Sequence, residues 1–267
     1  MPAESPLQPA MPVTQGARVE SGKAARGPPS RSRARAWGGR LLTLWHFLRQ
    51  RVYSEHRAVG LRRDLQRPFA TPEAKVPLHL RRLTEEDRRA LASPQPGESE
   101  VERFERRSRL AMLEAGLQTC YAAVDAQGQL CYVQWLLTPE QNPRLQAFFR
   151  GSFPVLAPDE ALLEGAFTLA SRRGLRIMPC AMAQIALKGQ DAGVRWVLTF
   201  VSEGNEASLK GCQRSGFEPY VLRRATWRLF RHRYRFEPLQ QEPQRRLPTA
   251  VPAMRREQPS APLGSRA

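Results

Sequence analysis

The chain has 267 residues with 42 Lys and Arg against 25 Asp and Glu, so its formal net charge is +17 and its pI is near 11.0. This length suits one domain of moderate size with tails, or at most two small domains. No apolar run of about 18 residues is present, which excludes a transmembrane helix. The first residues include Glu4 and Glu20 and no apolar stretch, so we expect no secretory signal and a cytoplasmic location.

The two terminal segments lack the large apolar residues that a core needs. Residues 1–36 are rich in Pro, Ala, Ser and Gly, and residues 237–267 are rich in Pro, Gln and Arg. Neither segment can bury enough surface to offset its ordering entropy, so we expect both to be disordered tails. The part between them, 37–236, is itself basic, and its natural partners are therefore anions.

Residues 37–53 place Leu, Phe and Trp at three- and four-residue intervals with Arg between them. This spacing predicts a basic amphipathic helix, which a linker extends to residue 75. Such a helix can pack on the following domain, or it can make peripheral contact with an anionic membrane surface. We favour packing, because one short helix is marginal for membrane binding.

From Val76 onward the pattern predicts a folded domain that extends to residue 236. Residues 76–83 alternate as a strand does, and Thr84 with an acid three residues later marks a helix start. Next come a helix, a strand hairpin, a Pro-broken loop, a strand, a helix, a buried strand, a short helix and at least one further strand. The helix is expected at 99–114, the two hairpin strands at 118–124 and 129–137, and the loop at 139–160. The next strand and helix are expected at 161–170 and 177–187, the buried strand at 194–201, the short helix at 205–215 and the further strand at 220–230. Together they predict an α+β domain around a mixed sheet.

The four cysteines are Cys120, Cys131, Cys180 and Cys212. They are widely spaced, with no C-x-x-C pair and no His at the spacing of a zinc site. We therefore expect reduced thiols that pack as small hydrophobic residues, and no metal site.

The strongest local signal is the stretch Ser171-Arg172-Arg173-Gly174-Leu175-Arg176, which lies between the strand and the helix that begins at 177. A helix N-terminus offers unpaired backbone N–H groups and the positive end of a dipole, and Gly174 lets an anion approach the backbone. Three Arg side chains add positive charge and would repel one another unless an anion lay among them. The stretch therefore predicts a cradle for phosphate or pyrophosphate.

This stretch resembles the coenzyme A loop of the GCN5-related N-acetyltransferase (GNAT) family, whose pattern is Q/R-x-x-G-x-G/A between the fourth strand and third helix. A second stretch, Asn205-Glu206-Ala207-Ser208 followed by Gly216-Phe217, resembles the family's segment after the fifth strand. The resemblance covers roughly residues 76–225. It implies a three-layer αβα fold with a mixed, mostly antiparallel sheet, and acetyl-CoA or another acyl-CoA as co-substrate.

Three positions depart from the family pattern. Ser171 stands where Gln or Arg is usual, and Cys212 stands where many members have a Tyr that acts as general acid. Arg176 stands where Gly or Ala is usual, so its side chain either blocks the pyrophosphate or folds over it as a clamp. We favour the clamp.

The resemblance implies an acyltransferase in which an amine, or less often a hydroxyl, attacks the thioester directly. Glu164 is our first candidate base and Glu203 our second, and Cys212 is either the general acid or a buried helix residue. A backbone N–H of the fourth strand would polarise the thioester carbonyl. The candidate cofactor-binding residues are Phe167, Thr168, Leu169, Arg172, Arg173, Gly174, Leu175, Arg176, Ile177 and Asn205. The acceptor, which can be a sugar, a small metabolite or a protein terminus, has no readable motif.

Residues 221–236 interleave Arg with aromatic residues. This pattern can follow a nucleic-acid backbone and stack on bases, or it can be a last strand with a solvated Arg face. We favour the solvated basic face over nucleic acid or another polyanion as partner. The alternative to an enzyme is a non-catalytic basic adaptor with a degenerate acyltransferase fold.

Overall fold

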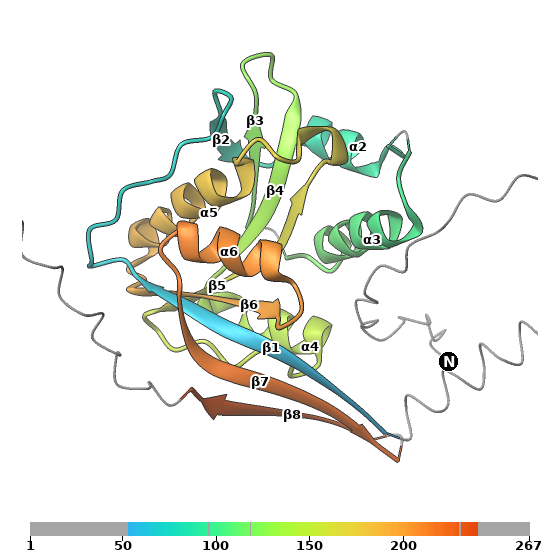
Figure 1. Ribbon diagram of the computed structural model, residues 1–267, viewed down its shortest axis with the longest axis vertical. Coiled ribbons are helices and arrows are strands. Elements are labelled where there is room, and N and C mark those ends of the chain that lie inside the picture. Colours follow the sequence, from blue (N-terminus) through green and yellow to red (C-terminus); the bar gives the residue numbers. More distant parts are fainter. Residues whose placement is uncertain (1–52, 96, 118, 230, 240–267) are drawn as a thin grey trace, which may run out of the picture.

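The computed structural model describes residues 53–95, 97–117, 119–229 and 231–239. They form one eight-stranded sheet in the order β2-β3-β4-β5-β6-β1-β7-β8 (Figure 1). The strands are β1 (Tyr53–Asp64), β2 (His79–Arg82), β3 (Cys120–Val124), β4 (Leu130–Leu137), β5 (Glu160–Thr168), β6 (Trp196–Ser202), β7 (Glu218–Arg228) and β8 (Arg231–Pro238). The α-helices are α2 (Glu85–Ala92), α3 (Glu100–Glu114), α4 (Asn142–Phe149), α5 (Ile177–Leu187) and α6 (Glu206–Arg214), with 3-10 turns at Pro139–Gln141, Ala170–Arg172 and Gln190–Ala192. Among these described helices, none is both long and apolar enough to cross a membrane.

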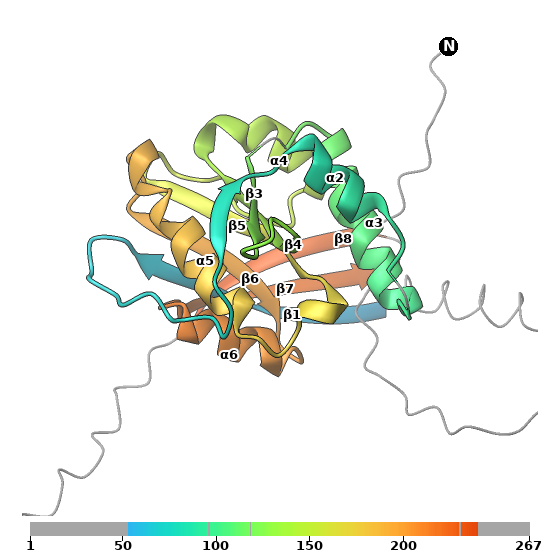
Figure 2. The same ribbon diagram turned by 90° about the horizontal axis from the view of Figure 1, so that it is seen from above.

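The sheet separates two hydrophobic cores. On one face, Ile177 and Met182 of α5 and Cys212 of α6 pack against the sheet, and we call this the α5–α6 face. On the other, residues of α2, α3 and α4 such as Leu91 and Leu145 form the second core, and we call this the α2–α4 face (Figure 2). The three layers and the mostly antiparallel sheet confirm the expected fold class. Among the described strands, the parallel pair is β5 with β6.

The N-terminal strand β1 lies in the middle of the sheet, antiparallel to both β6 and β7. The expected linker up to residue 75 and the expected domain start at Val76 are therefore wrong, because residues 53–64 belong to the fold. The remainder of the expected helix, 37–52, lies outside the described residues, as do the tail 1–36 and residues 240–267. At the other end β8 runs to Pro238, one residue beyond the expected start of the C-terminal tail.

The helix starts follow from local side-chain chemistry. Thr84 and Asp87 form a reciprocal capping box at α2, and Ser99 and Glu102 form another at α3, so both predicted starts are confirmed. The predicted loop 139–160 instead contains α4, which carries Pro143 in its first turn. Proline is tolerated there because the N–H it lacks has no helical partner.

Strands β5 and β6 diverge soon after they begin. They pair only from Glu160 with Trp196 to Leu162 with Leu198. Further along, the register of β5 against β4 shifts at a bulge that contains Gly165, whose φ is +70°. A Cβ at Gly165 would lie 2.7 Å from Cε3 of Trp135, so the bulge requires glycine. The divergence leaves the second half of β5 with one free edge.

Candidate active site at the divergence of β5 and β6

Glu164 lies at the start of the β5 bulge and faces the α2–α4 side of the sheet. It pairs in register with Trp135, and Phe200 lies two residues beyond the last β6 position paired with β5. Arg109 of α3 donates from Nε to the Gly165 carbonyl at 3.3 Å and from NH2 to the Ala166 carbonyl at 3.2 Å. Consecutive carbonyls of a regular strand point to opposite sides, so Arg109 stabilises the bulge that orients Glu164.

The environment of Glu164 favours its neutral form more than water does. Burial raises the pKa of Glu164 above its ordinary value, and this effect outweighs a hydrogen bond from the Gly165 N–H and the charges of Arg109 and Arg223. A carboxylate with a raised pKa is a stronger base than an exposed one. Glu203, the second candidate base, is exposed just beyond the end of β6.

The three expected backbone donors of β5 differ in direction. The Leu169 N–H donates to the Cys131 carbonyl on β4 at 3.1 Å. Because successive N–H groups of a strand point to opposite sides, the Thr168 N–H points to the free edge and the Phe167 N–H points to β4. Of the three, Thr168 is therefore the residue whose N–H can contact a ligand in the gap between β5 and β6.

The loop after β5 presents a run of unused backbone donors. The N–H groups of residues 174–178 form no hydrogen bond with other described residues. Gly174 at φ +77° and Arg176 at φ +57° are both left-handed, with Leu175 between them. Such alternation directs successive N–H groups toward one point and makes an anion-binding nest. A Cβ at Gly174 would meet nothing within 4 Å, so the nest is open to a ligand.

Two of the three Arg side chains in this loop bind carboxylates of neighbouring elements. Arg172 contacts Asp125 at 2.8 Å, and Arg173 pairs with Glu102 of α3. The expected repulsion among the three Arg residues is therefore wrong, because two of them have acidic partners. Arg176 has no ion pair or hydrogen bond with another described side chain, so it is the guanidinium free to contact an anion.

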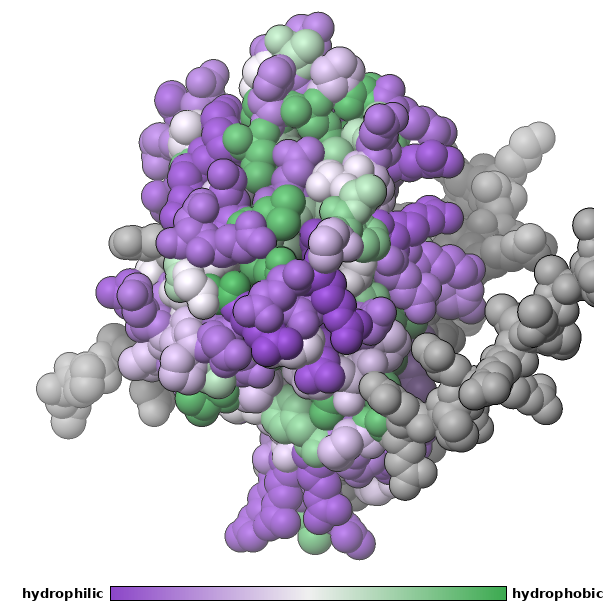
Figure 3. All heavy atoms as spheres, turned by 90° about the vertical axis from the view of Figure 1, so that its left-hand side faces the viewer, coloured by the Kyte–Doolittle hydropathy of each residue, from purple (hydrophilic) through white to green (hydrophobic). Residues whose placement is uncertain are grey.

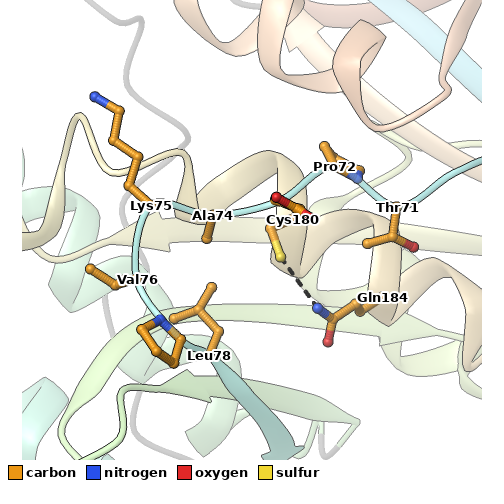
Figure 4. A pocket seen from close by; sticks show the side chains of 10 residues that line it. Thr71, Pro72, Ala74, Lys75, Val76, Leu78, Cys180 and Gln184 are labelled. Atoms are coloured by element: carbon orange, nitrogen blue, oxygen red, sulfur yellow. Dashed lines mark hydrogen bonds between the residues drawn. The ribbon is translucent and has the colours of Figure 1, made fainter.

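The connection from β1 to β2, residues 65–78, runs over α5, and we call it the strap. Its Lys75 N–H donates to the Leu175 carbonyl at 2.9 Å and so fastens the loop on one side. A pocket of about 440 Å³ lies between the strap and α5, where Cys180 and Gln184 line it and the Lys75 side chain points away (Figure 4). This side of the molecule exposes apolar side chains in small groups among hydrophilic ones (Figure 3). The pocket is on the α5–α6 face, whereas Glu164 is on the opposite face.

Asn205 caps the start of α6. Its Oδ1 accepts from the Ser208 N–H at 3.1 Å, so it is the helix cap that the sequence predicts. Gly211 lets α6 and α5 approach, because a Cβ there would lie 2.4 Å from the Met178 sulfur. Asn205 is itself an exposed residue, and its role toward a cofactor stays a prediction.

Cys212 lies in the core of the α5–α6 face and is 1% exposed. Burial raises the pKa of its thiol to about 12. The thiol therefore releases a proton reluctantly at neutral pH, which favours packing over general acid catalysis. All four cysteines are free and buried, as the sequence predicts.

We expect Cys212→Ala to leave kcat within about two-fold of the wild-type value and to lower the free energy of unfolding by about 1 kcal/mol, since it removes a buried packing atom. Steady-state kinetics and urea unfolding measure the two effects. A fall in kcat of about 100-fold with unchanged stability would identify the thiol as the acid.

Sequence reasoning missed the two arginines beside Glu164. Arg109 showed no signal of its own, but a glycine inside a strand pattern, here Gly165, signals a bulge that needs support.

Arg223 was predicted to belong to a solvated basic face, whereas the structure places it on the other side of β7. On β7 and β8, Arg224 and Arg235 pair in register on one side, while Trp227 stacks on His232 at 4.5 Å on the other. Arg and aromatic residues thus mostly lie on opposite sides, unlike a surface that binds backbone and bases together.

No protein-family model and no curated protein matches this chain. A solved structure of a fungal multi-domain GH3 β-N-acetylglucosaminidase with a GCN5-related glucosamine N-acetyltransferase region matches with a TM-score of 0.50 and 15% identity, over 73% of this chain and 23% of that one. A GNAT-family acetyltransferase from Colwellia psychrerythraea matches with a TM-score of 0.42 and 14% identity, over 70% of this chain and 57% of that one. A GCN5-related N-acetyltransferase from Sphaerobacter thermophilus matches with a TM-score of 0.41 and 16% identity, over 70% of this chain and 57% of that one.

The chain therefore spans less than two thirds of the length of these proteins. At such identities the likeness concerns the fold alone. Of the backbone features at this site, the sequence resemblance predicted the loop that leads into α5, whereas it did not predict the bulge in β5. In its architecture, the chain therefore has a fold similar to that of the GNAT acyltransferases.

Proposed function

We propose that this chain transfers an acyl group from acyl-CoA to an amine by direct attack on the thioester. The observation that carries the proposal is the run of free N–H groups at 174–178, which directly follows the strand that bears Glu164. An anion-binding nest and a partly desolvated carboxylate lie on one strand, loop and helix, at the divergence of the sheet. The fold supports the same conclusion.

The nest suits the pyrophosphate of acyl-CoA. Backbone N–H groups at a helix N-terminus bind phosphate oxygens, and the helix dipole adds attraction. Arg176 is the adjacent side chain with donors to spare, whereas Arg172 and Arg173 can contribute only by sharing or releasing their carboxylate partners. Asn205 stays a predicted contact of the ligand. From the nest, the free edge of β5 provides the Thr168 N–H for an amide or thioester carbonyl of an extended ligand.

When bound, acyl-CoA supplies the thioester, and the balanced reaction forms a C–N bond, breaks the C–S bond and releases CoA. Glu164 accepts the proton that the acceptor ammonium must lose, directly or through one water molecule. Its raised pKa brings it closer to the pKa of the amine. The departing sulfur needs a proton from solvent, because the Cys212 thiol is buried with a raised pKa.

Calorimetry with acetyl-CoA and Arg176→Gly tests the proposal. We expect wild type to bind at micromolar concentration and the variant to bind about ten-fold more weakly, because it loses a charge-assisted contact to phosphate. The variant should also gain up to about 1 kcal/mol in unfolding free energy, since position 176 is left-handed at φ +57°.

Arg150→Gly is the matched control, because Arg150 is an exposed arginine at φ +50° at the end of α4. It should gain similar stability and keep the wild-type affinity. Tighter binding by Arg176→Gly would mean that Arg176 blocks the site instead of clamping the ligand. No binding of acetyl-CoA or longer acyl-CoAs to wild type would contradict the enzyme and favour the basic adaptor.

A further inference from the structure

Arg223 of β7 is a half-buried arginine without a carboxylate partner. Its NH1 donates to the Ser152 carbonyl at 2.8 Å, and its Cζ lies 5.2 Å from the ring centres of both Phe153 and Phe200. None of the ion pairs between described residues includes it. A charge removed from water without a partner is unfavourable, and burial correspondingly lowers the pKa of Arg223.

Two other arginines that are buried to a similar or greater degree have a carboxylate partner, whereas Arg63, which is 3% exposed, donates to the Ala183 and Ser215 carbonyls instead. Arg106 is 5% exposed and pairs with Glu98 at 2.7 Å, and the half-buried Arg224 pairs with Glu55 at 3.2 Å. Arg224 is the immediate neighbour of Arg223 and points to the other side of the sheet. Of these two neighbours on β7, the arginine without a carboxylate partner is thus the one on the side that faces the candidate active site.

The position of Arg223 links it to Glu164. Phe200, on which Arg223 stacks, lies on β6 across the divergence from Glu164. Where strand β1 passes between Phe200 and Arg223, it places the small residues Ala58 and Gly60 on this face, so the arginine can lie over it. The charge of Arg223 also lowers the pKa of Glu164, although burial raises that pKa overall.

Arg223 has donors left for a ligand. Its NH1 donates to the Ser152 carbonyl, whereas Nε and NH2 donate to no other group of the described residues. Arg109, on the other side of Glu164, already donates to three carbonyls, those of Glu105, Gly165 and Ala166. Of the two guanidiniums, Arg223 is therefore the one that can present a two-donor fork, whose geometry matches a carboxylate.

We propose that the acceptor is an amine that carries a carboxylate, and that Arg223 binds the carboxylate while the amine lies at Glu164. This inference rests on the acyltransferase function proposed above. It assigns the acceptor to the class of free amino acids and related amino carboxylates. Arg223 compensates the charge of the acceptor and in return gains the partner that the fold does not provide.

Turnover of matched amines by the 267-residue chain tests the proposal. CoA release from acetyl-CoA is measured with each of the common L-amino acids and with the amine that differs from it only by lacking the carboxylate. We expect the KM of the preferred amino acid to be about 10- to 100-fold below that of its decarboxylated partner. Arg223→Gln and Arg223→Lys should raise the KM of the amino acid toward that of the amine, and change the KM of the amine little.

Arg224→Gln is the matched control and should keep the wild-type preference. Binding of the N-acetyl amino acid in the presence of CoA, measured by calorimetry, tests the subsite without turnover. Acetyl transfer without preference for the carboxylate, or a preference that survives in Arg223→Gln, overturns the subsite and leaves the acyltransferase intact. Binding that depends on Arg223 without any turnover supports the subsite and overturns the acyltransferase. Absence of both contradicts both proposals.

Discussion

Glu164→Gln is expected to lower kcat/KM for acyl transfer by a factor of about 10² to 10⁴, the usual contribution of a general base. The amide has nearly the same shape but cannot accept the ammonium proton. In the wild type, kcat/KM should fall below the raised pKa of Glu164, at a pH above the ordinary glutamate value of about 4.3. This acid limb should disappear in the variant, whose residual rate follows only the deprotonation of the amine.

Stability distinguishes this loss of activity from damage to the fold. Because the pKa of Glu164 is raised in the folded state, its favourable contribution to stability is present at low pH and is lost as pH rises through that pKa. Glu164→Gln should therefore keep or raise the melting temperature at pH 8. Glu203→Gln is the control, since that carboxylate is exposed, and should keep kcat within about two-fold. A large loss in Glu203→Gln with a mild one in Glu164→Gln would reverse the assignment of the base.

The fold was predictable where local pattern and tertiary structure agree. The helix at 177–187 was predicted with the bounds that the structure gives, because nearly all of its side chains are apolar and pack in the core. Strand β1 was not predicted, because its pattern includes Arg63. This arginine looks like a surface residue in the sequence, yet it is 3% exposed and donates to the Ala183 and Ser215 carbonyls. A buried arginine whose donors meet backbone carbonyls breaks the alternation on which strand prediction depends.

The residues of the candidate site likewise differ in how far the local sequence could predict their positions. Glu164, the loop and the start of α5 come from one continuous strand, loop and helix, so local sequence could place them together. The partners of the loop arginines, Asp125 and Glu102, come from a turn and a helix far away in sequence. Arg109 and Arg223 likewise reach Glu164 only through the packing of α3 and β7 on the sheet. These contacts depend on the arrangement of elements, which no local pattern contains.

Gly174→Asp is expected to weaken acyl-CoA binding by about 100-fold or more. Two unit charges about 4 Å apart near a protein surface repel by about 4 kcal/mol, and solvent exposure of the loop reduces this to about 3 kcal/mol, or two powers of ten in Kd. Gly174→Asn should cost far less, because Asn has the same size and tolerates the left-handed φ of +77°. The Asp defect should also shrink with salt, which screens repulsion.

Gly193→Asp is the matched control for position 174, because Gly193 lies beyond the opposite end of α5 at φ +71° and a Cβ there would meet nothing within 4 Å. It imposes the same backbone strain and the same charge away from the nest, so its Kd for acetyl-CoA should equal that of the wild type. Calorimetry at low and high salt measures all three variants. If Gly174→Asp and Gly174→Asn weaken acetyl-CoA binding equally and independently of salt, both substitutions have distorted the loop. That result would refute repulsion of the pyrophosphate as the cause. If neither changes Kd, the N–H groups at 174–178 do not bind the ligand, and acyl-CoA must be held elsewhere on the fold.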